Sequence, residues 1–379
     1  MEQPVIEQLV VDASRALLKT ADEFAVKNFP SGNGGPFGAI AAVLDFNSGS
    51  YKTIGNISAN AVLKTGSASA HAEDQWLQPD NLKSLVRELK KDWWNPRTVI
   101  LASSGQSCPA CHAKEEVVAR YLVRYGVIQR LNFVVAYGAT FKNTQEIAGF
   151  NDQPYVLDLV RCVRYPQSSV SMVKHKTASI KEIPSNIVLA FKNAGRQVCV
   201  VARGDNIVSV GYDDRSYCNF FSTAESMAIR NACTRQKAEG SLQPWVVGDV
   251  NHLAPDPQKK ATLYTTTQDV GPIMRGEAQW AAVNEIVSVT GLRGAKQTQE
   301  APDISNRALL GSVAQGYNHA QSVMRVCVDE GFANQAQHEW RKKLKKYGSA
   351  MLYNGIDSDP NLESFAVFAG SFKGLPLAL

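Results

Sequence analysis

Long apolar runs and a strong charge of either sign are both missing from this chain. No stretch reaches the ~18 apolar residues that a membrane-spanning helix needs, so no membrane span is expected. The first residues carry acidic side chains and no continuous apolar stretch, which argues against a secretory signal. The net charge of +5 permits an anionic partner but does not require one.

Cysteine is scarce, and its spacing excludes several classes of site. The chain has seven cysteines in 379 residues, an odd number, and five of them are scattered. With no export signal, this pattern indicates a reducing cytoplasm rather than a disulfide framework. The close pair is Cys108 and Cys111, and the second C-x-x-C of a zinc ribbon is lacking.

Hydrophobic periodicity predicts an α/β fold in the first half of the chain. Apolar residues recur at helical spacing between positions 6 and 24. After this helix we expect a hairpin of two strands, a helix that opens at His71 and is interrupted at Pro79, a second amphipathic helix, and then strand, helix and strand. These elements fall at residues 37–44, 51–57, 71–78, 82–89, 98–102, 108–125 and 131–137. The order predicts a mixed sheet covered by helices.

The second half repeats this order, which predicts a duplicated domain. A hairpin is expected at 197–202 and 207–211, a helix from Thr223, a strand at 262–266 and a helix at 276–286. The predicted boundaries are a first domain at 1–163, a linker at 164–185 that is rich in Ser, Lys and Pro, and a second domain at 186–379. Beyond the repeat, 305–348 looks helical and 364–379 apolar, and neither segment has an assigned place. The alternative is that the two α/β segments look alike by chance.

The chemistry of the first half rests on His71, Glu73, Cys108 and Cys111. Zinc prefers four tetrahedral ligands, so one imidazole and two thiolates leave a position for water. Glu73 is two residues past the imidazole and is expected to move protons for that water. Taken singly, such a histidine is usually structural and a C-x-x-C is redox-active or half of a structural site. Together they match the H-x-E…C-x-x-C pattern of the zinc-dependent base deaminases.

The second copy has lost these ligands. Thr223-Ala224-Glu225 stands in the place of His71-Ala72-Glu73. Aligning Gln106 with Gln268 puts Val270 and Ile273 where the cysteines stand, and these side chains cannot bind zinc. We therefore expect one zinc ion per chain, in the N-terminal domain, and a structural role for Glu225.

The chain resembles the cytidine deaminase-like superfamily, in the branch of guanine deaminases and tRNA adenosine deaminases. The motifs that carry this resemblance are the zinc pattern, the segment 35–40 (GPFGAI) and the segment 147–159, which is similar to a G-F-D-D motif. The resemblance implies two tandem three-layer α/β/α domains, the second degenerate. It also implies a base pocket formed by Pro36, Phe37, Gly38, Ala39, Ala72, Asn60 and Asp152. Asn60 is alternatively a turn residue, and Asp152 a cap.

Two departures from the family pattern affect the pocket rim. The family has Glu-Pro before its first cysteine, whereas this chain has Gln106-Ser107. The segment between Glu73 and Cys108 is longer than usual and contains Trp93 and Trp94, which either stack on a base or belong to the core. The departures leave the chemistry intact and the substrate open.

The leading prediction is a cytoplasmic zinc-dependent hydrolase that deaminates a purine nucleobase or nucleoside, of the guanine type, releasing ammonia. One alternative is an adenosine deaminase acting on tRNA or other RNA, with the inactive domain gripping the substrate as an intrachain pseudo-dimer. The basic run 341–346 suits phosphates, although a solvated helix face explains it equally well. The third hypothesis is a non-catalytic zinc-stabilised binding protein. Further oligomerisation is left open.

Overall fold

The structure is a computed structural model of the whole chain. It describes residues 3–28, 37–67, 69–91, 95–124, 133–139, 161–165, 183, 187, 190, 193–216, 218–241, 244–249, 255–267, 272–289 and 324–327. The chain divides into two compact units. The first unit comprises Met1–Lys64, Ala70–Asp152 and Arg307–Gly370, and the second comprises Thr65–Ser69, Gln153–Asn306 and Ser371–Leu379.

The first unit is built on a five-stranded mixed sheet in the order β10-β4-β3-β1-β2. Its strands are β1 (Gly38–Asp45), β2 (Tyr51–Ala59), β3 (Arg97–Gly105), β4 (Phe133–Ala139) and β10 (Met324–Cys327). Strand β1 pairs antiparallel with both β2 and β3, whereas β3, β4 and β10 run parallel. The predicted hairpin and the mixed sheet are therefore confirmed.

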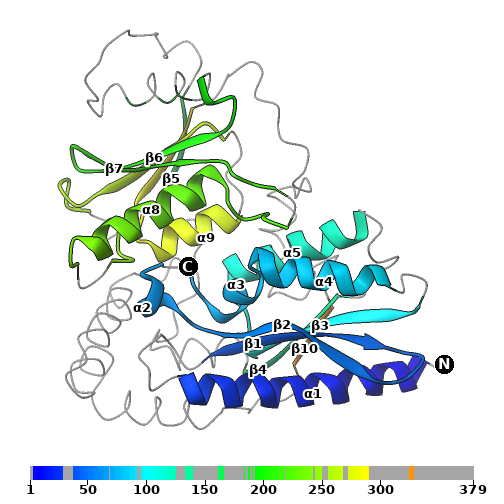
Figure 1. Ribbon diagram of the computed structural model, residues 1–379. Helices are drawn as coiled ribbons and strands as arrows, with labels where there is room; N and C mark the ends of the chain where they lie inside the picture. The colour runs from blue at the N-terminus through cyan, green and yellow to red at the C-terminus, as the bar shows by residue number, and fades with distance from the viewer. Residues whose placement is uncertain are drawn as a thin grey trace, which may run out of the picture. The chain divides into compact units, whose positions relative to one another are not determined.

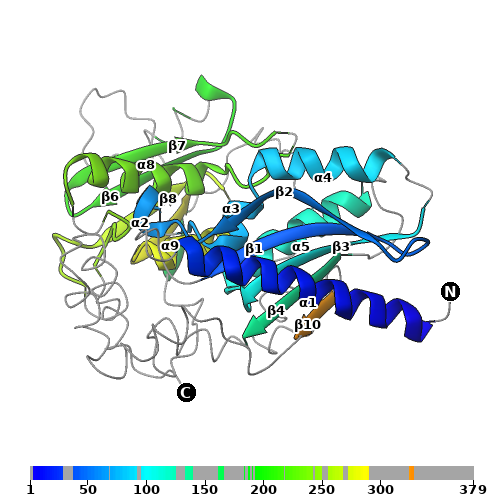
Figure 2. The same cartoon turned by 60° about the horizontal axis from the view of Figure 1, so that its bottom comes forward.

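Helices cover both faces of this sheet and make three layers (Figures 1 and 2). Helix α1 (Gln3–Asn28) lies on one face, and α3 (Ala72–Trp76), α4 (Pro79–Lys91) and α5 (Pro109–Arg124) lie on the other. The short α2 (Val62–Thr65) follows β2. Pro79 begins α4, a position where a proline's missing N–H costs the helix nothing.

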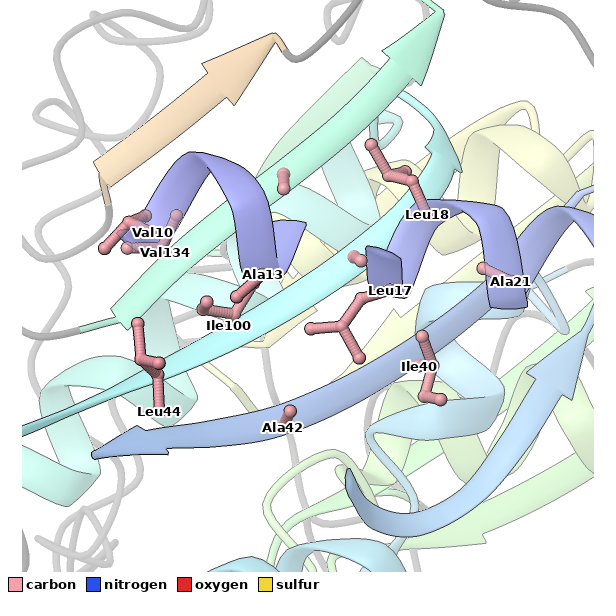
Figure 3. Packing of buried hydrophobic residues seen from close by; sticks show 12 residues of the cluster. Val10, Ala13, Leu17, Leu18, Ala21, Ile40, Ala42, Leu44, Ile100 and Val134 are labelled. Atoms are coloured by element: carbon pink, nitrogen blue, oxygen red, sulfur yellow. The ribbon is translucent and has the colours of Figure 1, made fainter. Parts of the chain in front are cut away.

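The core under α1 follows from the alternation of side chains along a strand. Ile40, Ala42 and Leu44 of β1 point to the same face. They pack against Leu17 and other apolar residues of α1 in one buried cluster (Figure 3). The other face of β1 is thereby left for Ala39 and Ala41, on the side of the sheet where α3 and α5 lie.

The second unit repeats the sheet strand for strand. Its order is β5-β9-β8-β6-β7, with β6 antiparallel to β7 and β8, and β8, β9 and β5 parallel. The elements are β5 (Arg161–Tyr165), β6 (Val198–Arg203), β7 (Asn206–Tyr212), α8 (Ala224–Ala238), β8 (Ala261–Thr265), α9 (Pro272–Trp280) and β9 (Glu285–Val289). Ile183 and Ile187 are helical and pack on Val198 and Val200, as α1 packs on β1. The repeat predicted from the sequence is thus present in strand order and direction.

The two units exchange their last strands. Strand β5 comes from the N-terminal part of the chain but pairs with β9 in the second sheet. Strand β10 comes from the C-terminal part but pairs with β4 in the first sheet (Figure 2). The units therefore interleave along the sequence, and the boundary placed at residue 163, like the start of the linker at 164, falls inside β5.

Two predicted helices are wrong in part. The helix expected at 276–286 ends at Trp280, and β9 starts at Glu285. Ala282 has a φ of 55°, a left-handed conformation that ends a helix, and Ile286, Val287 and Val289 favour a strand. In the segment 305–348, expected to be helical, residues 324–327 form β10; the rest of that segment and 364–379 lie outside the described residues. Across the described part of the chain, no helix combines the length and apolarity needed to cross a bilayer.

Candidate metal and catalytic site

Two helix N-termini bring the predicted zinc ligands together. His71 is the N-cap residue of α3, and its side chain makes no capping hydrogen bond, so the imidazole is not used to hold the helix start. Cys108 directly precedes α5, and Cys111 lies in its first turn. Backbone N–H groups at a helix start favour thiolates, which suits both cysteines to metal binding.

The three ligand atoms lie at zinc-binding separations. His71 Nδ1 is 3.4 Å from Cys108 Sγ and 3.8 Å from Cys111 Sγ, and all three atoms lie within 4.8 Å of one another. Tetrahedral zinc with ordinary Zn–N and Zn–S bonds holds nitrogen and sulfur about 3.5 Å apart. The residues therefore fit a zinc ion, and no other group of three histidine, cysteine or acidic side chains does so within the described ranges.

In the metal-free protein the pKa of Cys108 favours metal binding, whereas the pKa values of His71 and Cys111 oppose it. Burial would raise the pKa of Cys108, but a hydrogen bond from the Cys111 thiol and the neighbouring His71 outweigh it, so the pKa lies well below its usual value. Burial likewise would lower the pKa of His71, yet the adjacent Cys108 thiolate raises it above the usual value. Cys111 keeps its proton, because its hydrogen bond to Cys108 and its burial raise its pKa. A metal would displace these protons.

Glu73 is buried beside the trio and is held by one hydroxyl. Ser103 Oγ of β3 donates to Glu73 Oε1 at 2.5 Å. Burial raises the pKa of Glu73 to about 7, although the hydrogen bond from Ser103 and the charge of His71 oppose the shift. A carboxyl group that titrates near neutral pH can both take up and release a proton, as a general acid–base residue must.

The start of β1 and the loop after β2 complete the surroundings of Glu73. Phe37, Gly38 and Ala39 are all buried, and Gly38 N donates to Ser104 Oγ at 2.8 Å. Asn60 Oδ1 accepts a hydrogen bond from Ala72 N at 2.8 Å. The side-chain oxygen of Asn60 thus supports the backbone between His71 and Glu73, and the substrate contact expected of Asn60 stays a prediction.

Several predicted site residues lie outside the described residues. They are Pro36, Asp152, Val270, Trp93, Trp94 and the basic run 341–346. Their roles stay predictions.

The second unit keeps the carboxylate and its support but not the ligands. Thr265 Oγ1 donates to Glu225 Oε1 at 2.5 Å, as Ser103 does to Glu73. Thr223 stands at the N-cap of α8 and is used there, since its hydroxyl accepts from Ser226 N. Ile273 lies half-buried in α9. That Glu225 serves no metal stays a prediction.

The floor of this second site is also altered. Cys199 pairs with Thr265 across β6 and β8, in the register where Ala39 pairs with Ser103. Burial, together with the nearby Glu225 carboxylate, raises the pKa of Cys199 well above its usual value, so it is a neutral thiol. A larger side chain than alanine therefore occupies the position next to the retained carboxylate.

Three polar residues of the site were not predicted from the sequence. Ser103 and Ser104 follow the apolar run 99–102 in a strand in which every residue is buried, and this pair of hydroxyls is the signal that could have found them. Ser58 donates to the carbonyl oxygens of Ala39 and Ala72, joining β1 to the start of α3. Nothing in the sequence around Ser58 marks it.

Comparisons with known proteins find likenesses among solved structures alone. No protein-family model matches the chain, and no curated protein matches it. Among solved structures, it is similar to guanine deaminase from Bacillus subtilis at 21% identity, over 47% of this chain and 93% of that one, with a TM-score of 0.24. A TM-score that low supports no inference about fold or function.

Proposed function

We propose that this chain is a zinc-dependent hydrolytic deaminase acting on a purine nucleobase or nucleoside of the guanine type. The observation that carries the proposal is the placement of Glu73 two residues past His71, buried, with a pKa of about 7, beside two cysteines at zinc-binding separation. A purely structural zinc site has no use for such a carboxyl group. The net reaction replaces an exocyclic amine by water's oxygen and releases ammonia.

Each part of the site has a task in this reaction. His71, Cys108 and Cys111 would hold the zinc ion, which when bound supplies the Lewis acidity that makes water nucleophilic near neutral pH. Glu73 accepts one proton from the attacking water and passes it to a ring nitrogen of the base. It then accepts the second proton, from the hydroxyl group formed at the ring carbon, and delivers it to the departing amine. Ser103 fixes one carboxylate oxygen, which leaves the other free to make these transfers.

The groups around Glu73 favour a flat heterocycle. Phe37, Gly38 and Ala39 offer an apolar floor with little side-chain bulk, and burial there excludes water other than the reacting molecule. The Asn60 amide nitrogen is a donor for a ring nitrogen or carbonyl oxygen of the base. We propose one zinc ion per chain, with the second unit as a metal-free counterpart inside the same chain.

The test compares the two glutamates of the two units. Glu73→Gln in the full chain should keep one zinc ion and lower ammonia release from purines by at least about 100-fold, because a general acid–base group contributes that much or more. Glu225→Gln is the matched control, because it changes the same residue type, also bonded by a strand hydroxyl, in the unit without ligands. It should leave turnover unchanged. Equal activity of wild type and Glu73→Gln, or a wild-type chain without zinc, contradicts the proposal.

The salt dependence of deamination distinguishes a free base or nucleoside from RNA as the substrate. A screen of purines, pyrimidines, their nucleosides and tRNA for ammonia release identifies the substrate directly. Deamination of adenosine in RNA should weaken steeply as salt rises, because phosphate contacts release counterions. Deamination of a free base should barely change.

A further inference from the structure

A buried ion pair stands beside the metal ligands and is not accounted for by the proposed chemistry. Lys114 Nζ of α5 contacts Asp74 Oδ1 of α3. The two side chains are 0% and 2% exposed, so the pair is fully withdrawn from water. Gln78 supports the same turn of α3 by donating to the Asp74 carbonyl oxygen at 2.8 Å.

The pair repeats the spacing of the ligands on both helices. Asp74 is three residues past His71, and Lys114 is three residues past Cys111. Residues three apart on a helix are neighbours on one face, so each charge lies one turn from a ligand. The pair therefore ties together the two helix starts whose separation determines whether His71 and the cysteines reach one ion.

Stability alone does not explain why these residues are charged. The desolvation of a buried ion pair commonly cancels its attraction, and replacing both partners by apolar residues is often neutral or stabilising. The second unit joins α8 to α9 through Ser226, which donates to Glu277. Ser226 is three residues past Thr223, as Asp74 is past His71, and Glu277 lies one residue beyond the position that corresponds to Lys114. A link between the helices thus exists there without a lysine, in the unit that has no thiol ligands.

We propose that Asp74 and Lys114 are positioning residues of the metal centre: they fix α3 against α5 so that His71, Cys108 and Cys111 meet one zinc ion, and they place a cation beside the two thiolates. This inference rests on the proposed zinc site. A lysine one turn from Cys111 offsets the negative charge that two thiolates and Glu73 bring into a buried space. Groups that orient metal ligands in this way typically change metal affinity by about 10- to 100-fold when they are lost.

The test uses the full chain and cobalt(II) as a spectroscopic substitute for zinc. The double variant Asp74→Leu/Lys114→Met removes both charges together, so no unpaired charge stays buried and the fold should persist. We expect cobalt to bind about 10- to 100-fold more weakly, chelator-driven zinc release to speed up in proportion, and the thiolate-to-cobalt absorption to shift. Lys114→Arg keeps the cation and should recover most of the affinity.

Two further variants separate positioning from folding. The swapped pair Asp74→Lys/Lys114→Asp keeps an ion pair but puts the carboxylate beside Cys111, and it should bind cobalt as weakly as the apolar double variant. Ser226→Ala changes the corresponding link in the second unit and should leave cobalt binding as it is in the wild type.

The outcomes distinguish this inference from the function on which it rests. A wild-type chain that takes up cobalt through its thiolates, with a folded apolar or swapped variant that binds it equally tightly, overturns the positioning role alone. A wild-type chain that takes up no metal overturns both.

Discussion

At the scale of single residues, Glu73 and Glu225 show that the chemistry open to a buried carboxylate depends on the side chains around it. Each glutamate lies in the first turn of a helix, is buried, and accepts a hydrogen bond from a hydroxyl on the third strand of its sheet. Glu73 has an imidazole two residues before it, whereas Glu225 has Thr223, whose hydroxyl caps the helix instead. Under the proposed function, Glu225 is therefore a packed structural acid, whereas Glu73 is the catalytic one.

The sequence was sufficient to predict the site residues that lie close together along the chain. It was insufficient to predict those whose partners are far away in the sequence. His71 and Glu73 share one helix start, and Cys108 and Cys111 share another, so each pair is visible as a motif. Ser103 meets Glu73 across 30 residues, and only the register of β3 against β1 decides that meeting.

A surface cluster around Glu88 gives a pH-dependent prediction for stability. Lys52 of β2 and Lys91 of α4 both contact Glu88 Oε2, at 2.9 and 3.0 Å. Hydrogen bonds from Lys52 and then Lys91 hold the pKa of Glu88 below its usual value, although partial burial opposes them. Glu88→Gln should lower the free energy of unfolding at pH 7 by about 0.5–1 kcal/mol, as measured by urea denaturation of the metal-free chain.

The sign of the pH effect follows from the lowered pKa. The folded state releases the proton of Glu88 more readily than the unfolded state, so its contribution is complete above the ordinary glutamate pKa of about 4.3 and is lost as the pH falls through the folded value. Wild type and Glu88→Gln should therefore converge toward pH 3. Asp80→Asn, in an exposed pair with Lys83, is the control and should change the free energy of unfolding at pH 7 less than Glu88→Gln does. A stability difference at Glu88 that stays constant down to pH 3 would rule out this account.

At the scale of elements, apolar periodicity predicted most helices and strands correctly. The prediction failed where a short apolar stretch is compatible with both a helix and a strand. The hairpin expected at 37–44 and 51–57 is β1 and β2, and β2 extends two residues further than expected, to Ala59. The apolar spacing predicted that α9 continues into β9, because the residues between them are alanine and valine. The left-handed turn at Ala282 instead ends the helix and changes the direction of the chain. Strand β10 has four residues, too few for any period to be visible, and pairing with β4 is what makes it a strand.

The close approach of α1 to β1 gives a second prediction. A Cβ atom on Gly38 would lie 2.2 Å from the carbonyl oxygen of Ala21 and 3.3 Å from the Cβ of Ala25, both on α1. Because the nearest atom belongs to the backbone, the helix itself must move. Gly38→Ala should cost about 1–3 kcal/mol in urea unfolding, and Gly38→Leu clearly more, since overpacking grows with the added volume.

Gly195 is the comparison site for Gly38. It has a φ of +65°, and a Cβ atom added there would meet no atom within 4 Å, so only its backbone conformation resists substitution. Alanine and leucine should both cost about 1–2 kcal/mol there, without a dependence on size. If the loss of unfolding free energy at Gly38 also did not depend on side-chain size, α1 would be shown to move away from β1 at little cost.

At the scale of the whole molecule, the exchange of β5 and β10 makes each half of the sequence necessary to the other's sheet. The sequence predicted four of the five strands in the first sheet and three in the second, where a helix was expected to run into β9. Nothing local says which sheet a short strand joins. Both exchanged strands lie at an edge of their sheet, each next to one partner, β9 or β4. The N-terminal half, which holds every proposed zinc ligand, therefore takes its last described strand from the C-terminal part of the chain.

Proline substitutions test this exchange because an edge strand bonds its neighbour through alternate N–H groups. Of Arg325→Pro and Val326→Pro in β10, one removes an N–H that faces β4 and the other removes one that faces away. The first kind should cost about 1–3 kcal/mol and the second much less. The same comparison applies to Val163→Pro and Arg164→Pro in β5, which pair with Val287 and Ser288.

Hydrogen exchange and zinc affinity show which of the two sheets each proline substitution weakens. The harmful β10 proline, although it lies near residue 325, should speed hydrogen exchange in β3 and β4 and loosen zinc, because β10 extends the first sheet. The harmful β5 proline, although it lies within the first 165 residues, should speed exchange in β8 and β9 and leave zinc affinity unchanged. If each strand belonged to the sheet of its own half, the two results would be reversed, with β5 prolines releasing zinc. Crossed effects are thus what an exchanged pair of strands requires.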